Sequence, residues 1–88
     1  MKTIKLEIDH ICTVRALHIY LAYKLELPAH YGKNLDALYD ALCETSEDTK
    51  IVLAGVPAGN EMAAYVPRLE CVLSDAAQEN GHMCFERV

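Results

Sequence analysis

Three short strand-like segments are separated by stretches with helical periodicity, and this alternation restricts the fold more than any other feature of the sequence. The segments span residues 2–8, 50–54 and 83–87. Strands joined through a helical crossover run parallel, and such crossovers are right-handed. The sequence therefore predicts an α/β fold with helices packed against a small three-stranded parallel sheet, in the order β-α-α-β-α(α)-β.

The first two strands differ in how their apolar residues are spaced. Ile4, Leu6 and Ile8 alternate with polar residues, which is the pattern of a strand covered on one face. Residues 51–54 are apolar without a break, which is typical of a strand buried on both faces. We therefore expect the second strand to lie in the middle of the sheet.

Capping residues mark two helices between these strands. Thr13 is placed to cap the first helix, which Pro28 ends, and Asn34 is placed to cap the second. The residues expected to face the core are Val14, Leu17, Leu21 and Leu25 in the first helix and Leu35, Leu38 and Leu42 in the second. Ile19 and Tyr23 point away from the first stripe, so we expect the far side of that helix to be partly covered.

The stretch between the second and third strands contains two helix-start signals. Asn60 is placed to cap a short helical turn through Tyr65, and Pro67 suits the first position of a longer helix. Asn80 and Gly81 form a typical helix end. We therefore expect one helix or a pair of helices here.

Length and charge exclude several classes of protein. A chain of 88 residues suffices for one domain, spanning residues 1–88. The net charge of −5 argues against direct nucleic acid binding. No apolar run approaches the roughly 20 residues of a membrane span, and the N-terminal residues alternate instead of forming a signal-peptide core. We therefore expect a cytoplasmic protein with no membrane association.

The cysteines and histidines are too scattered for a recognisable metal site or disulfide framework. The four cysteines contain no C-x-x-C pair, and the four histidines are equally dispersed. Without a secretion signal, we expect reduced thiols that mostly fill the core. The sequence predicts no metal and no cofactor.

The negative charge is concentrated in one block. Five acidic residues account for the whole net charge, uninterrupted by Lys or Arg: Asp36, Asp40, Glu44, Glu47 and Asp48. Asp36 and Asp40 lie one helical turn apart on the side away from the leucines, with Cys43 on their side and Tyr39 at the boundary. Because like charges at this spacing repel, helix stability does not account for them. One interpretation is a solvated helix face, and the other is a surface for cationic groups of a partner.

Residues 27–42 read Leu-Pro-Ala-His-Tyr-Gly-Lys-Asn-Leu-Asp-Ala-Leu-Tyr-Asp-Ala-Leu. This segment resembles the signature of the barstar family of ribonuclease inhibitors, in which leucine-proline and tyrosine-glycine precede N-L-D-A-L-[aromatic]-D-A-L on the second helix. The clear resemblance covers residues 14–44, and the order of elements agrees throughout. It implies the same α/β fold that the alternation of strands and helices predicts.

The resemblance also implies a function and a site. It implies a protein that plugs the active site of a microbial, barnase-like ribonuclease in a 1:1 complex, in an immunity role. Asp40 would take the place of a substrate phosphate, and Asp36 would face further basic residues. The residues implied to bind the partner are His30, Gly32, Asn34, Leu35, Asp36, Tyr39, Asp40, Cys43 and Glu44.

The chain departs from the family pattern at several contact positions. His30 replaces a tyrosine, Tyr39 replaces a tryptophan, and the chain has no tryptophan at all. Counting back from Gly81 places Ala76 where the family has a further contacting glutamate, with Asp75 or Glu79 as alternatives. These departures favour a nuclease that is related to barnase but distinct from it.

Two other functions fit parts of the sequence. An enzyme could use Asp36 and Asp40 as an acid–base pair, but such pairs need a cleft, and the chain has no phosphate-binding glycine loop or nucleophile elbow. The other alternative is a barstar-like module that binds a basic partner other than a nuclease, because a fold does not determine a partner.

Overall fold

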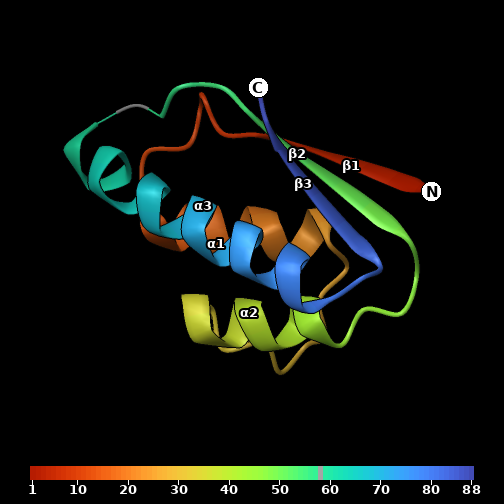
Figure 1. Ribbon diagram of the computed structural model, residues 1–88. Helices are drawn as coiled ribbons and strands as arrows, with labels where there is room; N and C mark the ends of the chain where they lie inside the picture. The colour runs from red at the N-terminus through yellow and green to blue at the C-terminus, as the bar shows by residue number, and fades with distance from the viewer. Residues whose placement is uncertain (58) are drawn as a thin grey trace.

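A computed structural model describes residues 1–57 and 59–88 (Figure 1). In chain order, its elements are β1 (Lys2–Glu7), α1 (Val14–Lys24), α2 (Leu35–Cys43), β2 (Thr49–Ala54), α3 (Asn60–Glu79) and β3 (Met83–Arg87). The strands form a parallel sheet in the order β1-β2-β3. The predicted α/β class, the parallel strands and the central place of the second strand are confirmed.

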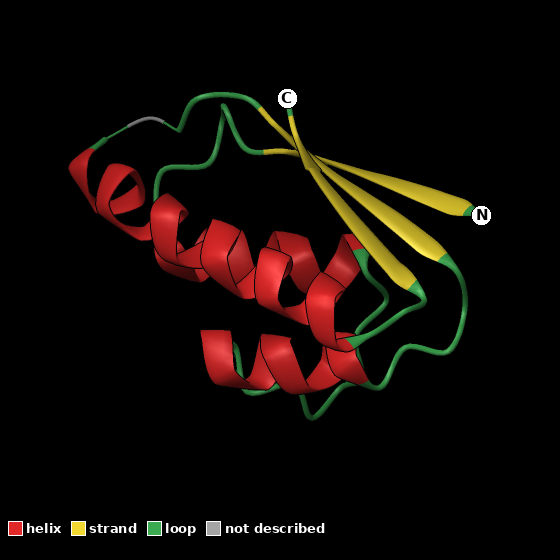
Figure 2. Ribbon diagram, viewed as in Figure 1, coloured by secondary structure: helices red, strands yellow, loops and turns green. Residues whose placement is uncertain are grey.

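Helices cover one face of the sheet, as Figure 2 shows. In β2, the buried side chains of Ile51 and Leu53 alternate with the half-buried Val52 and Ala54. The expectation that this strand is buried on both faces is therefore wrong. An unbroken apolar run permits a second covering layer, but the chain has no further helix in its described part to supply one.

The helices form two layers on the covered face of the sheet. In the layer next to the sheet, α1 packs against β1, α3 packs against β3, and the two helices contact each other. The outer layer is α2, which packs against α3 and lies farthest from the strands (Figure 1). Leu35, Leu38 and Leu42 are its buried residues, so the opposite side of α2 is left to solvent.

Local capping signals explain where the helices begin and end. The side-chain oxygen of Thr13 accepts a hydrogen bond from the backbone N–H of Ala16 (3.1 Å). The side-chain oxygen of Asn34 accepts one from the N–H of Ala37 (2.8 Å). Asn80 closes α3 as its C-cap. These three predicted caps are confirmed.

The segment after β2 forms one continuous helix, α3, rather than a short turn followed by a second helix. Gly59 is its N-cap, Asn60 is its first residue, and Pro67 lies inside it. Pro67 has no N–H for the carbonyl of Ala63, but both residues are exposed, so water can reach that carbonyl. One buried stripe continues on both sides of the proline and holds the helix together: Met62, Val66, Leu69, Leu73 and Ala76.

Two expectations about burial are wrong. The far side of α1 is uncovered, since Ile19 is 50% exposed and Tyr23 is 80% exposed. The four cysteines are free, as predicted, but they do not fill the core: Cys43 is half-buried and the other three are exposed. Leucine and isoleucine make up most of the core instead, and each buries more apolar surface than a cysteine does.

Candidate functional site

The loop that leads into α2 is shaped by short local hydrogen bonds. The N–H of Tyr31 donates to the carbonyl of Pro28 (3.0 Å), and the side-chain amide of Asn34 donates to the carbonyl of Gly32 (3.2 Å). A Cβ atom on Gly32 would lie 3.2 Å from that Asn34 amide, so a larger residue would press on the helix cap. The loop and the start of α2 therefore form one unit.

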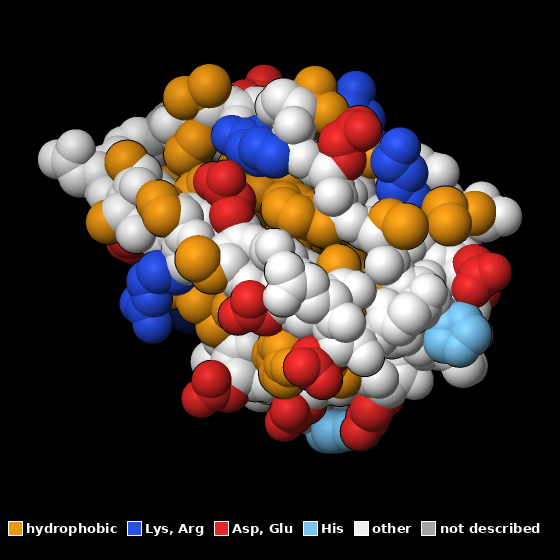
Figure 3. All heavy atoms as spheres, in the orientation of Figure 1, with side chains coloured by type: hydrophobic (Ala, Val, Ile, Leu, Met, Phe, Trp, Pro, Cys, Tyr) orange, Lys and Arg blue, Asp and Glu red, His pale blue; other side chains and the backbone are white. Residues whose placement is uncertain are grey.

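The solvent side of α2 carries three carboxylates at successive turns, Asp36, Asp40 and Glu44, which we call the acidic face. All three side chains are exposed. In the described part of the chain, no ion pair involves any of them. Figure 3 shows acidic side chains gathered over the side of the molecule formed by α2, with the Lys and Arg side chains of this view lying elsewhere. The acidic face is thus an unneutralised anionic surface on a rigid helix.

A hollow of about 250 Å³ lies between the loop and the acidic face. Its walls come from both elements: Pro28, His30, Tyr31, Gly32, Ala37, Asp40, Ala41 and Glu44. We call it the loop hollow. Because the exposed carboxylates Asp40 and Glu44 both line the hollow, it could receive a cationic side chain of a partner.

Tyr39 connects the acidic face to α3. A hydrogen bond with Cys43 and partial desolvation raise the pKa of Tyr39, and the negative charges of Glu79 and Asp75 raise it further. Asp75 and Glu79 are exposed residues of α3, so the acidic surface continues from α2 onto the neighbouring helix. Ala76, by contrast, is fully buried and belongs to the core, so Asp75 and Glu79 are the acidic residues that this part of α3 exposes.

The structure brings most of the predicted contact residues to one surface. His30, Gly32, Asn34, Asp36, Asp40 and Glu44 are exposed, and Tyr39 and Cys43 are half-buried beside them. Leu35 is 9% exposed and belongs to the core, so it supports this surface from beneath. The Asn34 side chain is engaged in capping α2.

Sequence reasoning did not find the buried residue behind the loop, His18. Its ring lies in α1 with hydrogen-bond partners on both nitrogens, Tyr31 Oη on one side and Tyr65 Oη on the other. The stripe of α1 contained a signal, because His18 follows Leu17 directly and is one turn from Leu21 and Val14. Only the packing of α1 against α3 shows that it is buried.

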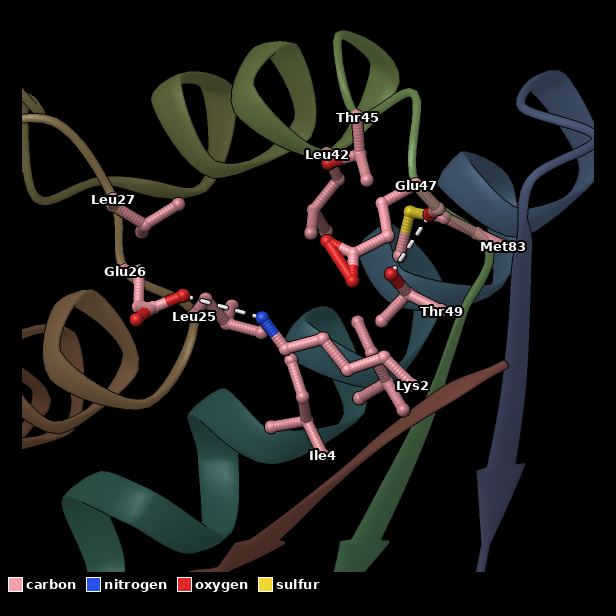
Figure 4. A pocket seen from close by; sticks show the side chains of 11 residues that line it. Lys2, Ile4, Leu25, Glu26, Leu27, Leu42, Thr45, Glu47, Thr49 and Met83 are labelled. Atoms are coloured by element: carbon pink, nitrogen blue, oxygen red, sulfur yellow. Dashed lines mark hydrogen bonds and ion pairs between the residues drawn. The ribbon is translucent and has the colours of Figure 1, made fainter.

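A second hollow, of about 170 Å³, lies where the strands begin, beside Lys2, Thr49 and Met83 (Figure 4). The ammonium group of Lys2 is paired with Glu26 across a distance of 3.2 Å, as Figure 4 shows. Parallel sheets bind ligands beyond the carboxyl ends of their strands, which is the opposite end. This hollow therefore gives no support to an enzyme active site.

Neither a cluster of metal-ligating side chains nor a membrane-spanning helix is found in the described ranges 1–57 and 59–88. No group of three or more His, Cys, Asp or Glu side chains there could hold a metal ion. None of the helices described is long and apolar enough to cross a membrane.

Comparison with known proteins agrees with this arrangement of sheet, loop and acidic helix. The family model described as Barstar (barnase inhibitor) matches residues 1–86 of the 88-residue chain. The chain belongs to the Barstar family. The resemblance seen in residues 14–44 thus extends over almost the whole sequence, including α3 and β3.

The description of the Barstar family indicates the kind of activity and the kind of partner that are typical of its members. The family is one of inhibitors and not of catalysts, and its description names a ribonuclease as the partner in general. No curated protein compared with this chain matches it.

Proposed function

We propose that this Barstar family member acts inside the cell as an inhibitor of a barnase-like ribonuclease, forming a 1:1 complex in an immunity or antitoxin role. The acidic face and the loop hollow would plug the nuclease active site. The observation that carries this proposal is the set of exposed, unpaired carboxylates on α2 beside the loop hollow, in a chain that matches the Barstar family over residues 1–86.

The negative charge of the acidic face complements the active site of a ribonuclease, which binds the phosphates of RNA. A ribonuclease active site is built to hold phosphates with Arg, Lys and His side chains, and a fixed carboxylate satisfies the same donors without offering a bond to cleave. Asp40 lies on the wall of the loop hollow and is the proposed phosphate mimic. Asp36 lies one turn earlier on the same exposed side and would meet further basic residues.

The flanking residues have proposed roles of their own. His30 belongs to the loop and lines the hollow together with Asp40, and it would contact the catalytic groups of the nuclease. Tyr39 and Cys43 would form the rim toward α3, where Asp75 and Glu79 add negative charge. The smaller Tyr39 in place of a tryptophan and His30 in place of a tyrosine favour a nuclease distinct from barnase itself.

The test is a titration of ribonuclease activity with the purified, reduced protein, first with a barnase-type enzyme and then with nucleases encoded beside the gene. Wild-type protein is expected to inhibit stoichiometrically. Asp40→Asn removes one charge without changing shape and is expected to weaken binding by about 2–5 kcal/mol, the usual cost of leaving a partner charge buried and unpaired.

Glu47→Gln is the matched control. Glu47 belongs to the same acidic block and is exposed, but it lies in the loop before β2, away from the loop hollow. It should change the association rate slightly and leave dissociation unchanged. If no nuclease is inhibited, the proposal is wrong and a basic partner of another kind becomes the better explanation. If Asp40→Asn and Glu47→Gln lose the same affinity, Asp40 contributes only general charge attraction and is not a phosphate mimic.

A further inference from the structure

His18 occupies the junction of three elements. Its side chain is 1% exposed, although it belongs to a residue type that is usually half-buried or exposed. Nδ1 lies 2.6 Å from Tyr31 Oη in the loop before α2, and Nε2 lies 2.8 Å from Tyr65 Oη in α3. We call these three residues the histidine bridge. The bridge ties the loop to the helix layer next to the sheet.

Hydrogen bonding and burial together favour a neutral ring. A neutral imidazole has one donor and one acceptor, and each phenol can take the complementary role. Every buried side-chain nitrogen and oxygen in the described residues has a partner. A protonated ring would have two donors, and both hydroxyls would then have to accept from it inside a largely apolar environment.

The charged groups around the histidine bridge have opposite effects on the protonation of the His18 ring: the positive charge of Arg68 disfavours it, and the negative charges of Glu61 and Asp40 favour it. On α3, the guanidinium group of Arg68 lies over the Tyr65 ring, 5.4 Å from its centre, and disfavours a second positive charge. Glu61 of α3 accepts a hydrogen bond from the N–H of Val14 (2.6 Å), one turn from His18, and Asp40 of α2 lines the loop hollow together with Tyr31. Burial nevertheless lowers the pKa of His18, so the neutral ring is favoured at neutral pH.

Tyr31 links His18 to the loop before α2. Its backbone N–H closes the turn with Pro28, and its hydroxyl lies 3.5 Å from the carbonyl of Asn34, the N-cap of α2. His30 and Gly32 are its immediate neighbours and line the loop hollow with it. Displacement of Tyr31 would therefore move the loop side of the proposed binding surface.

We propose that His18 is a positioning residue for the partner-binding loop. Through Tyr31, its neutral ring holds residues 28–34 against α2, and its protonation in acid releases the loop and weakens partner binding. This inference rests on the proposed function for its effect on binding. Its effect on the loop can be measured in the free protein.

The free-protein test compares two matched variants. Tyr31→Phe and Tyr65→Phe each remove one hydroxyl bonded to the same ring, on the loop side and on the α3 side. Both are expected to lower the melting temperature, but only Tyr31→Phe should increase amide exchange at residues 30–34, by tenfold or more. Similar exchange rates in the two variants would overturn the inference.

The second test measures affinity between pH 4.5 and 8 in a His30→Gln background, which removes the exposed histidine of the proposed binding surface itself. His18→Asn keeps an amide near the position of Nδ1, toward Tyr31, but cannot titrate. The parent protein is expected to lose at least tenfold more affinity on acidification than the His18→Asn variant. Superimposable profiles would contradict the role of His18.

The two proposals fail in different ways. If the parent protein binds no nuclease at any pH, the proposed function is wrong, and the exchange rates of residues 30–34 still decide whether His18 positions the loop. In nuclear magnetic resonance spectra of the free protein, these loop amides should shift with the same midpoint as the His18 ring. Independent midpoints would overturn the positioning role even if inhibition is observed.

Discussion

Gly55 shows how a single residue can restrict the path of the chain. It follows β2 with a φ angle of 101°, a conformation that side chains with a Cβ rarely adopt. A Cβ atom at this position would lie 2.9 Å from the backbone nitrogen of Asp9. The exit of β2 and the loop after β1 therefore approach each other too closely for any other residue.

We expect Gly55→Ala to lower the free energy of unfolding by about 1–3 kcal/mol, because it combines an unfavourable φ angle with a backbone clash. The measurement is urea denaturation followed by circular dichroism. Gly81→Ala is the control, since nothing lies within 4 Å of the added Cβ and the φ angle there lies outside the positive range that strains a side chain. Its change should stay within about 0.5 kcal/mol. Equal effects at the two glycines would contradict this account.

Asn80 links the ends of two helices through a buried side chain. Its amide donates to the carbonyls of Leu42 (2.9 Å) and Thr45 (2.8 Å), and its oxygen accepts from the N–H of His82 (2.9 Å). The C-terminal carbonyls of α2 have no partner within their own helix, so Asn80 supplies one. Asn80 thus holds the end of the helix that carries the acidic face.

Asn80→Ala is expected to destabilise the protein by about 1–3 kcal/mol, because it removes the buried side-chain donor shared by the carbonyls of Leu42 and Thr45. Amide exchange at the C-terminal end of α2 should also become faster. Asn60→Ala, at an exposed position in the first turn of α3, should have a much smaller effect. If Asn80→Ala and Asn60→Ala lower the free energy of unfolding equally, Asn80 does not hold the end of α2.

At the scale of elements, α2 carries a charge pattern that does not favour its own stability. Asp36 lies in the first turn, where the helix dipole favours a negative charge. Asp40 and Glu44 lie further along, each four residues after the preceding carboxylate, and no basic residue occupies the last turn. Such a pattern is expected where a surface is selected for binding rather than for helix stability.

Asp40→Asn should therefore stabilise the free protein slightly, by roughly 0.2–0.5 kcal/mol, while it weakens inhibition. Asp36→Asn should bring no such gain, because it also removes a favourable charge from the first turn. Urea denaturation of both variants at low ionic strength measures the difference. A clear loss of stability in Asp40→Asn would indicate a structural role for this carboxylate.

At the scale of the whole molecule, the titration of the histidine bridge links stability to pH. The pKa of His18 is lowered in the folded protein, so the unfolded chain binds a proton first as the pH falls below about 6.5. The free energy of unfolding should then decrease by up to about 1.4 kcal/mol per pH unit until folded His18 is itself protonated.

Denaturation at pH 7 and pH 5 tests this sign. Wild-type protein should be less stable at pH 5, and His18→Asn should show a smaller difference because it cannot titrate. The other histidines are exposed and serve as an internal comparison through a His30→Gln variant. If wild-type protein and His18→Asn change equally in stability between pH 7 and pH 5, the neutral ring of His18 does not account for the pH dependence.

The asymmetric charge of the molecule should also govern how fast it meets a basic partner. Ionic screening shortens the range of the acidic face from about 30 Å at 0.01 M salt to about 3 Å at 1 M. Stopped-flow measurements should therefore show an association rate that falls at least tenfold over this range, with a nearly constant dissociation rate. A rate independent of salt would show that the acidic face does not steer association.

Local sequence patterns determined much of this protein. Alternation in the first strand, helix caps at Thr13 and Asn34, and crossovers between strands were sufficient to predict the parallel sheet with its central second strand. The leucine stripe of α2 was also sufficient to predict which side of that helix faces solvent. These features depend on residues within one or two turns of each other, so periodicity and capping chemistry reveal them. The assignment of partner-binding roles to nine of the residues between positions 30 and 44 remains a prediction.

Only the tertiary structure decided the features that join distant segments. It buried His18 between Tyr31 and Tyr65, brought the charges of Asp75 and Glu79 to Tyr39, and left one sheet face and three cysteines exposed. Each depends on how α1, α2 and α3 pack against one another. Such contacts arise from the summed burial of many side chains, and the spacing of residues along the chain does not record that sum.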